Sequence, residues 1–188
     1  MKQMEITLLD KTSPLSRQNW LERVPLPPDM AESVYRSSVV FLPIESFRGV
    51  VNFSFPQGTS DLYQFLLKHR GELGQTELCI TDDDYQELAL YSREIRLGHL
   101  LVTQVVAPVL IGLLTNYIYD IVKSDPDDNV TLTLQVEGKC NDILIKYDGP
   151  AKDFQLIKPH LLSLTHECDS EKNRIYSTKE GPDDILKI

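Results

Sequence analysis

The sequence predicts an α+β fold: a small mixed sheet with helices in the N-terminal part, then a long apolar helix, an antiparallel β-hairpin and a C-terminal helix. Three observations predict it. Short β-branched and aromatic runs bounded by Pro and Gly recur between residues 38 and 81, which is typical of short strands. Residues 105–114 contain no polar side chain, which indicates a helix buried on every side. Apolar and polar residues alternate over 130–137 and again over 143–147, the period of two half-buried strands.

The composition is that of an acidic globular protein. The chain has 188 residues, with 28 Asp and Glu against 19 Lys and Arg, so its formal charge is -9. This charge disfavours nucleic acid, because phosphates are bound mainly by clustered Lys and Arg, and it disfavours an anionic membrane surface. A hydrophobic fraction of 41% is ordinary for a folded chain.

We expect one α+β domain over residues 1–165. A subdivision near 82–84 would separate an N-terminal α/β part from a helix–hairpin–helix part. Residues 166–188 are expected to form a flexible polar tail with an apolar terminus, because charges of both signs dominate most of that segment.

Cysteine usage and the N-terminus favour the cytoplasm. The three cysteines are widely spaced and form no CxxC pair, which favours reduced thiols over a zinc site or a disulfide framework. The first residues lack the apolar core of a signal peptide. The sequence therefore predicts a cytoplasmic protein with no metal and no cofactor.

The N-terminal part is expected to contain four short strands and three helices. Pro25 and Pro27 break the chain after the first helix, and Pro28 suits the first turn of the second. Thr59 or Ser60 can cap the third helix through a side-chain oxygen. The predicted strands cover residues 5–9, 38–42, 51–55 and 76–81, and the predicted helices cover 16–23, about 28–35 and 59–69.

The acidic run at 82–84 is expected to begin the long helix, since carboxylates there accept from free backbone N–H groups. A calcium or magnesium site is the alternative. The helix is predicted from about Tyr85 to Val122, with a kink near Gln104 caused by Pro108.

The apolar stretch of that helix, residues 100–114, must be buried in the protein's own core, against a partner or in a bilayer. The uninterrupted apolar run, residues 105–114, is so short that it is more typical of a core helix than of a membrane span. We expect mostly core burial, with one side left for a protein partner or for self-association. The candidate contact residues are Val105, Val109, Gly112 and Leu113.

The loop at 124–129 begins with the spacing of an EF-hand, but Val130 and Val136 occupy the positions that need Gly and Glu, so an exposed turn is expected. The hairpin strands follow. A C-terminal helix is then predicted from Pro150, bent at Pro159, with Phe154 and further apolar residues at three- and four-residue steps.

The last residues regain apolar character after the polar tail. A short apolar terminus of this kind can add a strand to the edge of a neighbouring sheet. Ile185, Leu186 and Ile188 are therefore candidate interaction residues.

Signatures of catalysis are absent from the sequence. None of the four histidines belongs to a metal-binding spacing such as HExxH, and no GxSxG, P-loop or GxGxxG motif occurs. A Cys168–His pair assembled by the fold stays open, because nucleophile and base need not be neighbours in sequence. We assign no catalytic residue.

The run of helix, hairpin and a helix beginning at Gly149-Pro150-Ala151, roughly from Tyr85 to Leu164, resembles in its order of elements the small companion proteins of bacterial conflict and phage-defence systems. That resemblance implies an accessory or sensor role beside a separate effector in antiviral defence, and it assigns no residues.

The sequence therefore favours a non-catalytic protein-interaction, accessory or adaptor protein. One alternative is a small enzyme or ligand-binding domain whose site forms only in three dimensions, in a deep pocket with His99 or His69 beside a Cys, Asp or Glu. Another is a membrane-active effector that uses the 100–114 helix.

Overall fold

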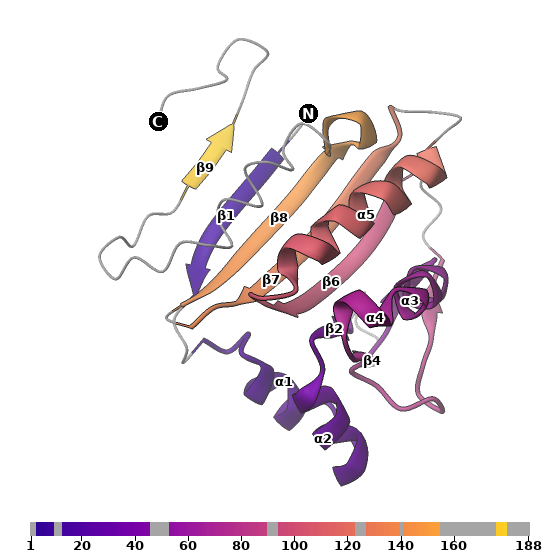
Figure 1. The fold of residues 1–188 in the computed structure, drawn as a ribbon, viewed down its shortest axis with the longest axis vertical. Coiled ribbons are helices and arrows are strands. Elements are labelled where there is room, and N and C mark those ends of the chain that lie inside the picture. Colours follow the sequence, from indigo (N-terminus) through magenta and orange to yellow (C-terminus); the bar gives the residue numbers. More distant parts are fainter. Residues whose placement is uncertain are drawn as a thin grey trace.

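A computed structural model describes residues 3–9, 13–45, 53–89, 94–122, 127–139, 141–154 and 176–179. They form an α+β fold built on one mixed sheet of strand order β4-β2-β6-β7-β8-β1-β9, with a small second sheet of β3 and β5 (Figure 1). The strands are β1 (Gln3–Leu9), β2 (Val39–Leu42), β3 (Phe55–Pro56), β4 (Thr76–Leu78), β5 (Glu87–Leu88), β6 (Ile95–Thr103), β7 (Asn129–Glu137), β8 (Asp142–Pro150) and β9 (Tyr176–Lys179). The helices are α1 (Arg17–Arg23), α2 (Pro28–Arg36), α3 (Thr59–Lys68), α4 (Arg70–Leu73) and α5 (Ala107–Ile121).

The sheet is mixed because two of its pairs are parallel. β2 pairs parallel with β4, and β6 pairs parallel with β7, while the remaining neighbours run antiparallel. Parallel neighbours need a crossover, and α5 supplies it between β6 and β7. In Figure 1 α5 lies across these strands.

One buried residue from each of five adjacent strands lines up across the sheet. The register pairs Phe41 with Leu100, Leu100 with Leu134, Leu134 with Ile145, and Ile145 with Ile6. All five side chains are buried. Because paired residues project to the same side of a sheet, this row defines one apolar face.

Helices α3 and α5 cover that face. Tyr63 of α3 packs edge-on against Phe41, with ring centroids 5.7 Å apart. Phe65 of α3 contacts Tyr117 of α5, with ring centroids 5.0 Å apart. The core therefore lies between the sheet and these two helices.

Helix α1 covers the opposite face. Trp20 packs edge-on against His99 of β6, with ring centroids 6.0 Å apart. His99 precedes Leu100 in the strand, so its side chain projects away from the α3 and α5 side.

The expected long helix over 85–122 is wrong in its first half. Residues 95–103 form β6, and the helix begins only at Ala107 and has 15 residues. β6 lies inside the sheet, with Leu100 and Val102 buried on one side and Leu101 on the other. A strand that is buried on both faces has a continuous apolar sequence, and the periodicity of such a sequence does not distinguish it from a buried helix.

The expected kink at Pro108 is also wrong. Pro108 lies in the first turn of α5, where no helical hydrogen bond needs its missing N–H. The acidic run 82–84 forms a turn rather than a helix start, and Thr81 Oγ1 donates to Asp84 Oδ2 there at 2.6 Å.

The strands β7 and β8 are antiparallel neighbours, from Asn129 opposite Pro150 to Glu137 opposite Asp142. The predicted hairpin is not a separate element, because β7 also pairs with β6 and β8 also pairs with β1, so both strands belong to the large sheet. The N-terminal strands likewise do not form a small sheet of their own: β1, β2 and β4 belong to the same large sheet. The element order on which the resemblance to companion proteins rests is therefore not the one observed.

Pro150 ends β8, and an α-helix begins directly after it, over 151–154, one residue from the predicted start. The rest of the predicted C-terminal helix lies outside the described residues. Within the tail, only Tyr176–Lys179 are described, as a strand paired antiparallel with β1. In the part of the chain that the structure describes, no helix is long and apolar enough to cross a membrane.

Candidate interaction site

Large exposed hydrophobic side chains gather at α5. Among the described residues, four are markedly exposed: Val105 at 87%, Tyr35 at 60%, Tyr119 at 59% and Ile121 at 43%. Three of these four lie on α5 or in the turn before it. Scattered exposed apolar residues are ordinary, whereas a group of them on one element marks a candidate contact surface.

The two sides of α5 differ in burial. Its inner side is buried on the sheet through Ala107, Leu110, Ile111, Leu114 and Ile118. Its outer side carries Val109, Gly112, Asn116 and Tyr119, and Val105 lies in the turn just before the helix; we call these five residues the outer stripe. Three of these, Val105, Asn116 and Tyr119, are exposed, and the other two are half-buried. Steps of three and four residues place Val109, Gly112, Asn116 and Tyr119 on one line along the helix.

The outer stripe is uncharged. Asp120 is the one charged residue between 107 and 121, and it lies at the C-terminal end of the helix. A surface helix usually presents several charged side chains to water. The outer side of α5 therefore resembles a contact surface more than an ordinary solvated face.

A neighbouring helix holds α5 in place along one flank. Tyr117 packs on Phe65 of α3, and Phe65 in turn contacts His69 with ring centroids 4.9 Å apart. These contacts lie beside the stripe and involve none of its five residues. The stripe is thus presented by a helix that is fixed on its inner side and along one flank.

The structure divides the predicted contact residues into surface residues, one buried residue and residues outside the described ranges. Val105, Val109 and Gly112 belong to the outer stripe, whereas Leu113 is 9% exposed and packs in the core. Ile185, Leu186 and Ile188 lie outside the described residues. Asn116 and Tyr119 were missed, although continuing the four- and three-residue steps past Gly112 would have reached both.

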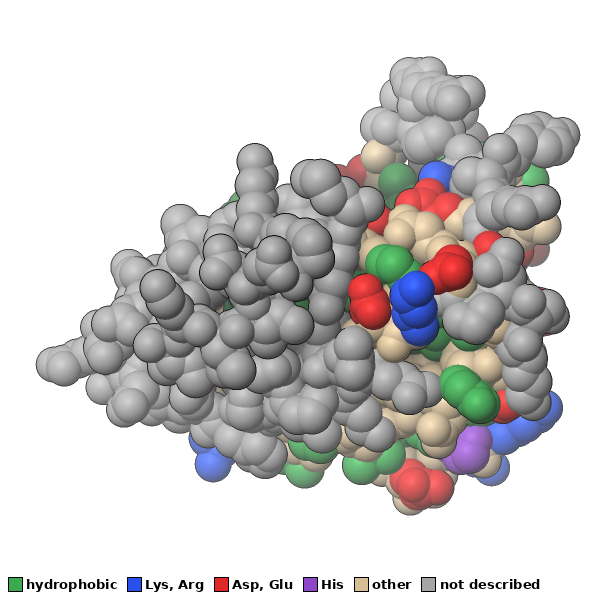
Figure 2. All heavy atoms as spheres, turned by 90° about the horizontal axis from the view of Figure 1, so that it is seen from above, with side chains coloured by type: hydrophobic (Ala, Val, Ile, Leu, Met, Phe, Trp, Pro, Cys, Tyr) green, Lys and Arg blue, Asp and Glu red, His purple; other side chains and the backbone are tan. Residues whose placement is uncertain are grey.

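A second surface has a different character. On the face seen from above in Figure 2, the described acidic and basic side chains lie next to one another, and the hydrophobic ones are scattered. That part of the surface has no patch of a single charge sign of the kind that nucleic acid requires.

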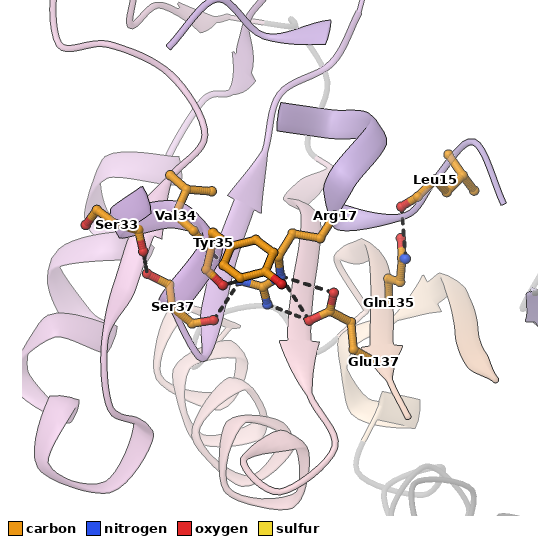
Figure 3. A network of polar contacts seen from close by, with 8 residues as sticks. All are labelled: Leu15, Arg17, Ser33, Val34, Tyr35, Ser37, Gln135 and Glu137. Carbon is orange, nitrogen blue, oxygen red and sulfur yellow. Dashed lines mark hydrogen bonds and ion pairs between the residues drawn. The ribbon is translucent and has the colours of Figure 1, made fainter. Parts of the chain in front are cut away.

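A buried polar network holds α1 and α2 to the end of β7 (Figure 3). The Arg17 guanidinium donates to Glu137 through Nε at 3.1 Å and through Nη2 at 2.5 Å. Its Nη1 donates to the carbonyl oxygens of Val34 at 2.7 Å and Ser37 at 2.8 Å, at the C-terminal end of α2. Arg17 is only 8% exposed and its donors are occupied, so we assign it to stability rather than to ligand binding.

His99 is a half-buried histidine whose imidazole is neutral at pH 7. Desolvation by burial lowers its pKa to about 4, the nearby cations of Lys146 and Arg23 lower it slightly further, and the Gln135 side chain opposes this. The Arg23 guanidinium lies 4.1 Å from the centre of the Trp20 ring that covers His99.

The enzyme alternative requires a pocket at His69 or His99, and a cavity formed by described residues lies elsewhere. A cavity of about 480 Å³ lies where α3 and α4 meet β4, and neither His69 nor His99 lines it. Its lining residues are Tyr63, Leu67, Arg70, Gly71, Gly74, Gln75, Thr76 and Glu77. Cys79 is buried, and desolvation raises the pKa of its thiol to about 12, which disfavours the nucleophilic thiolate.

A carboxylate from β5 caps α3. Glu87 accepts from the backbone N–H groups of Gly58 at 2.9 Å and Ser60 at 2.7 Å, and from the Tyr85 hydroxyl at 2.6 Å. These donors favour the ionised form, so the pKa of Glu87 is lowered although burial opposes this. Two of the backbone N–H groups at the start of this helix are thus satisfied from within the chain.

Metal binding and homology give no further assignment. Within the described ranges, no three His, Cys, Asp or Glu side chains are grouped in a way that could hold a metal ion. No family model, no curated protein and no solved structure matches this chain. The candidate site therefore rests on the surface of α5 alone.

Proposed function

We propose that this chain is a non-catalytic protein-binding protein, of accessory or adaptor type, whose contact surface is the outer stripe of α5. One observation carries the proposal: three of the four most exposed large hydrophobic side chains among the described residues lie on or beside this helix. The stripe between them is uncharged. Exposed apolar area on a fixed helix gains free energy when another surface covers it.

A protein partner fits this surface better than other ligands do. The stripe is the convex side of a helix, which packs against a helix or into an apolar groove rather than enclosing a small molecule. Nucleic acid requires cations, and α5 contains none. Tyr119 and Asn116 add a hydroxyl and an amide, which supply directional hydrogen bonds at a contact.

Site-specific photo-crosslinking tests the proposal. A benzophenone amino acid replaces Asn116 in the full chain, expressed in its native cells, and Gln64 on the exposed side of α3 is the matched control. Both are polar, exposed helical positions. We expect defined protein adducts from position 116 and none of comparable yield from position 64. Equal adduct yields at the two positions, or no adduct at 116, would refute the α5 surface as the binding site.

A further inference from the structure

We infer that the cavity between α3, α4 and β4 binds a small monocarboxylate with an apolar body, at a site separate from the outer stripe. The cavity measures about 480 Å³, which is within the range of sites for small organic ligands. All of its lining residues lie between positions 63 and 77, on α3, on α4, on β4 and in the turn that leads into β4. Figure 1 shows α3 and α4 next to the end of the sheet that β4 forms.

A buried hydroxyl without a partner lies in the wall of this cavity. Thr76 is 3% exposed, and its Oγ1 has no hydrogen-bond partner among the described residues. In the register of β4 on β2, Leu78 pairs with Phe41, and Phe41 packs on Tyr63 of α3. Thr76 lies two residues before Leu78, so its side chain projects to the same side, toward α3. An unpaired buried hydroxyl costs free energy, and an acceptor atom placed beside it in the cavity removes that cost.

Arg70 supplies the cation of the site. It is an exposed residue of the lining, and within the part of the chain that the structure describes no side chain pairs with its guanidinium. A guanidinium matches a carboxylate through two parallel hydrogen bonds. Arg70 therefore selects a ligand that carries a carboxylate at one end.

Glu77 limits the ligand to a single negative charge. Its Oε1 already accepts from Ser33 Oγ at 3.0 Å and from Gln75 Nε2 at 3.2 Å. Arg70 and Glu77 are the two charged residues of the lining, so the cavity has no net positive charge. A phosphate monoester carries about two negative charges at pH 7 and meets Glu77 as well as Arg70, so the site favours a carboxylate over a phosphate.

Tyr63 and Leu67 form the apolar wall that α3 contributes. They lie four residues apart, so both side chains project from one face of the helix, and both are half-buried. An apolar ligand body packed on them is removed from water. The Tyr63 hydroxyl donates to the Thr76 carbonyl at 3.4 Å, a long bond that a nearer acceptor replaces. Desolvation by burial raises the pKa of this phenol, and the charges of Glu77 and Asp82 raise it further, so the hydroxyl keeps its proton to donate.

An NMR titration tests the site, with 3-phenylpropionate as the probe and 3-phenylpropionamide as its uncharged match. The two molecules share one apolar body and differ only at the end that meets Arg70. We expect a Kd of about 1 mM for the acid, as is typical of the affinity per atom of a ligand of this size, and at least tenfold weaker binding of the amide. The backbone ¹H–¹⁵N signals that shift should belong mainly to residues 63–77 of the full chain.

Four variants of the full chain separate the contacts. Arg70→Gln should weaken binding of the acid about tenfold, whereas Lys68→Gln removes an exposed cation outside the lining and should leave it unchanged. Gly71→Leu should fold and lose binding, because a Cβ at Gly71 meets no atom within 4 Å and the added side chain fills the cavity. Thr76→Val should weaken binding about threefold, and it should raise the urea midpoint of the free protein because an unpaired buried hydroxyl is removed.

Several results would overturn the inference. They are equal affinities for the acid and the amide, equal losses in Arg70→Gln and Lys68→Gln, unchanged binding in a folded Gly71→Leu chain, and no shifts at residues 63–77 with the acid at up to about 20 mM. Tighter binding of phenyl phosphate than of the acid would overturn the choice of a single carboxylate. Crosslinking from position 116 examines the outer stripe and is independent of all these outcomes.

Discussion

Replacing Arg17 by methionine tests the polar network that joins α1 and α2 to β7. The substitution keeps the unbranched apolar stem of the side chain and removes the guanidinium with every donor. It leaves the Glu137 carboxylate, 20% exposed, without its guanidinium. It also leaves the carbonyl oxygens of Val34 and Ser37, which Arg17 reaches at 2.7 and 2.8 Å, without this donor.

The expected magnitude follows from these contacts. Removing one partner of a buried ion pair costs about 3–5 kcal/mol, and each buried acceptor left unsatisfied costs about 1–3 kcal/mol. The two terms overlap, because the lost donor is the same group. We therefore expect Arg17→Met to lower the free energy of unfolding by about 4 kcal/mol, a large part of the stability of a typical domain.

Urea denaturation followed by circular dichroism measures this change. Arg36→Met is the matched control, since Arg36 forms an ion pair with Glu32 on the exposed surface of α2, where both side chains are more than half exposed. The control should change the free energy of unfolding by less than about 0.5 kcal/mol. If Arg17→Met proves too unstable to measure, Glu137→Gln, which keeps an acceptor, should cost about half as much. Equal losses for Arg17→Met and Arg36→Met would refute the structural role of the network.

Three further outcomes are expected. The pKa of His99 is about 4 in the folded protein and about 6.5 when unfolded, so its contribution to stability is fully present above pH 6.5 and is lost as the pH falls toward 4, by up to about 3 kcal/mol. Urea titrations at pH 7 and pH 4.5 should show a smaller loss of stability for His99→Gln than for the parent chain, and equal losses would contradict the neutral imidazole. Glu87→Gln should lower the free energy of unfolding by about 1 kcal/mol at pH 7, because it removes a charged cap of α3. The difference between the variant and the parent chain should shrink as the pH falls through the lowered pKa of the Glu87 carboxyl. Cys79 should resist iodoacetamide in the folded protein at pH 8 and react after unfolding, as read by peptide mass spectrometry, and rapid labelling of the folded chain would show that its thiol is accessible.

Local patterns predicted part of this fold. The alternation over 130–136 predicts a strand with Val130, Leu132, Leu134 and Val136 inward, and all four are buried in β7. Pro28 predicts the first turn of a helix, and α2 begins there. These features depend on neighbours within a few residues, which is the range over which a sequence pattern acts.

Other features depended on the environment that the fold supplies. The segment 95–103 is a strand because parallel β7 and antiparallel β2 flank it and helices cover both faces, which no local period records. Pro108 is compatible with a straight α5 only because the helix begins at Ala107. The sequence gives no local signal for the start of α5, because the segment before it is apolar as well.

The sequence by itself determined the acidity of the chain, the α+β class and the uncharged line from Val105 to Tyr119, because composition and helical spacing are properties of the chain. Only the tertiary structure decided which side of α5 faces water, that Leu113 is buried, and that Arg17 meets Glu137 across 120 residues. Those outcomes depend on strand pairing between distant segments. Such pairing is selected by the burial of whole faces at once, and no single stretch of sequence encodes it.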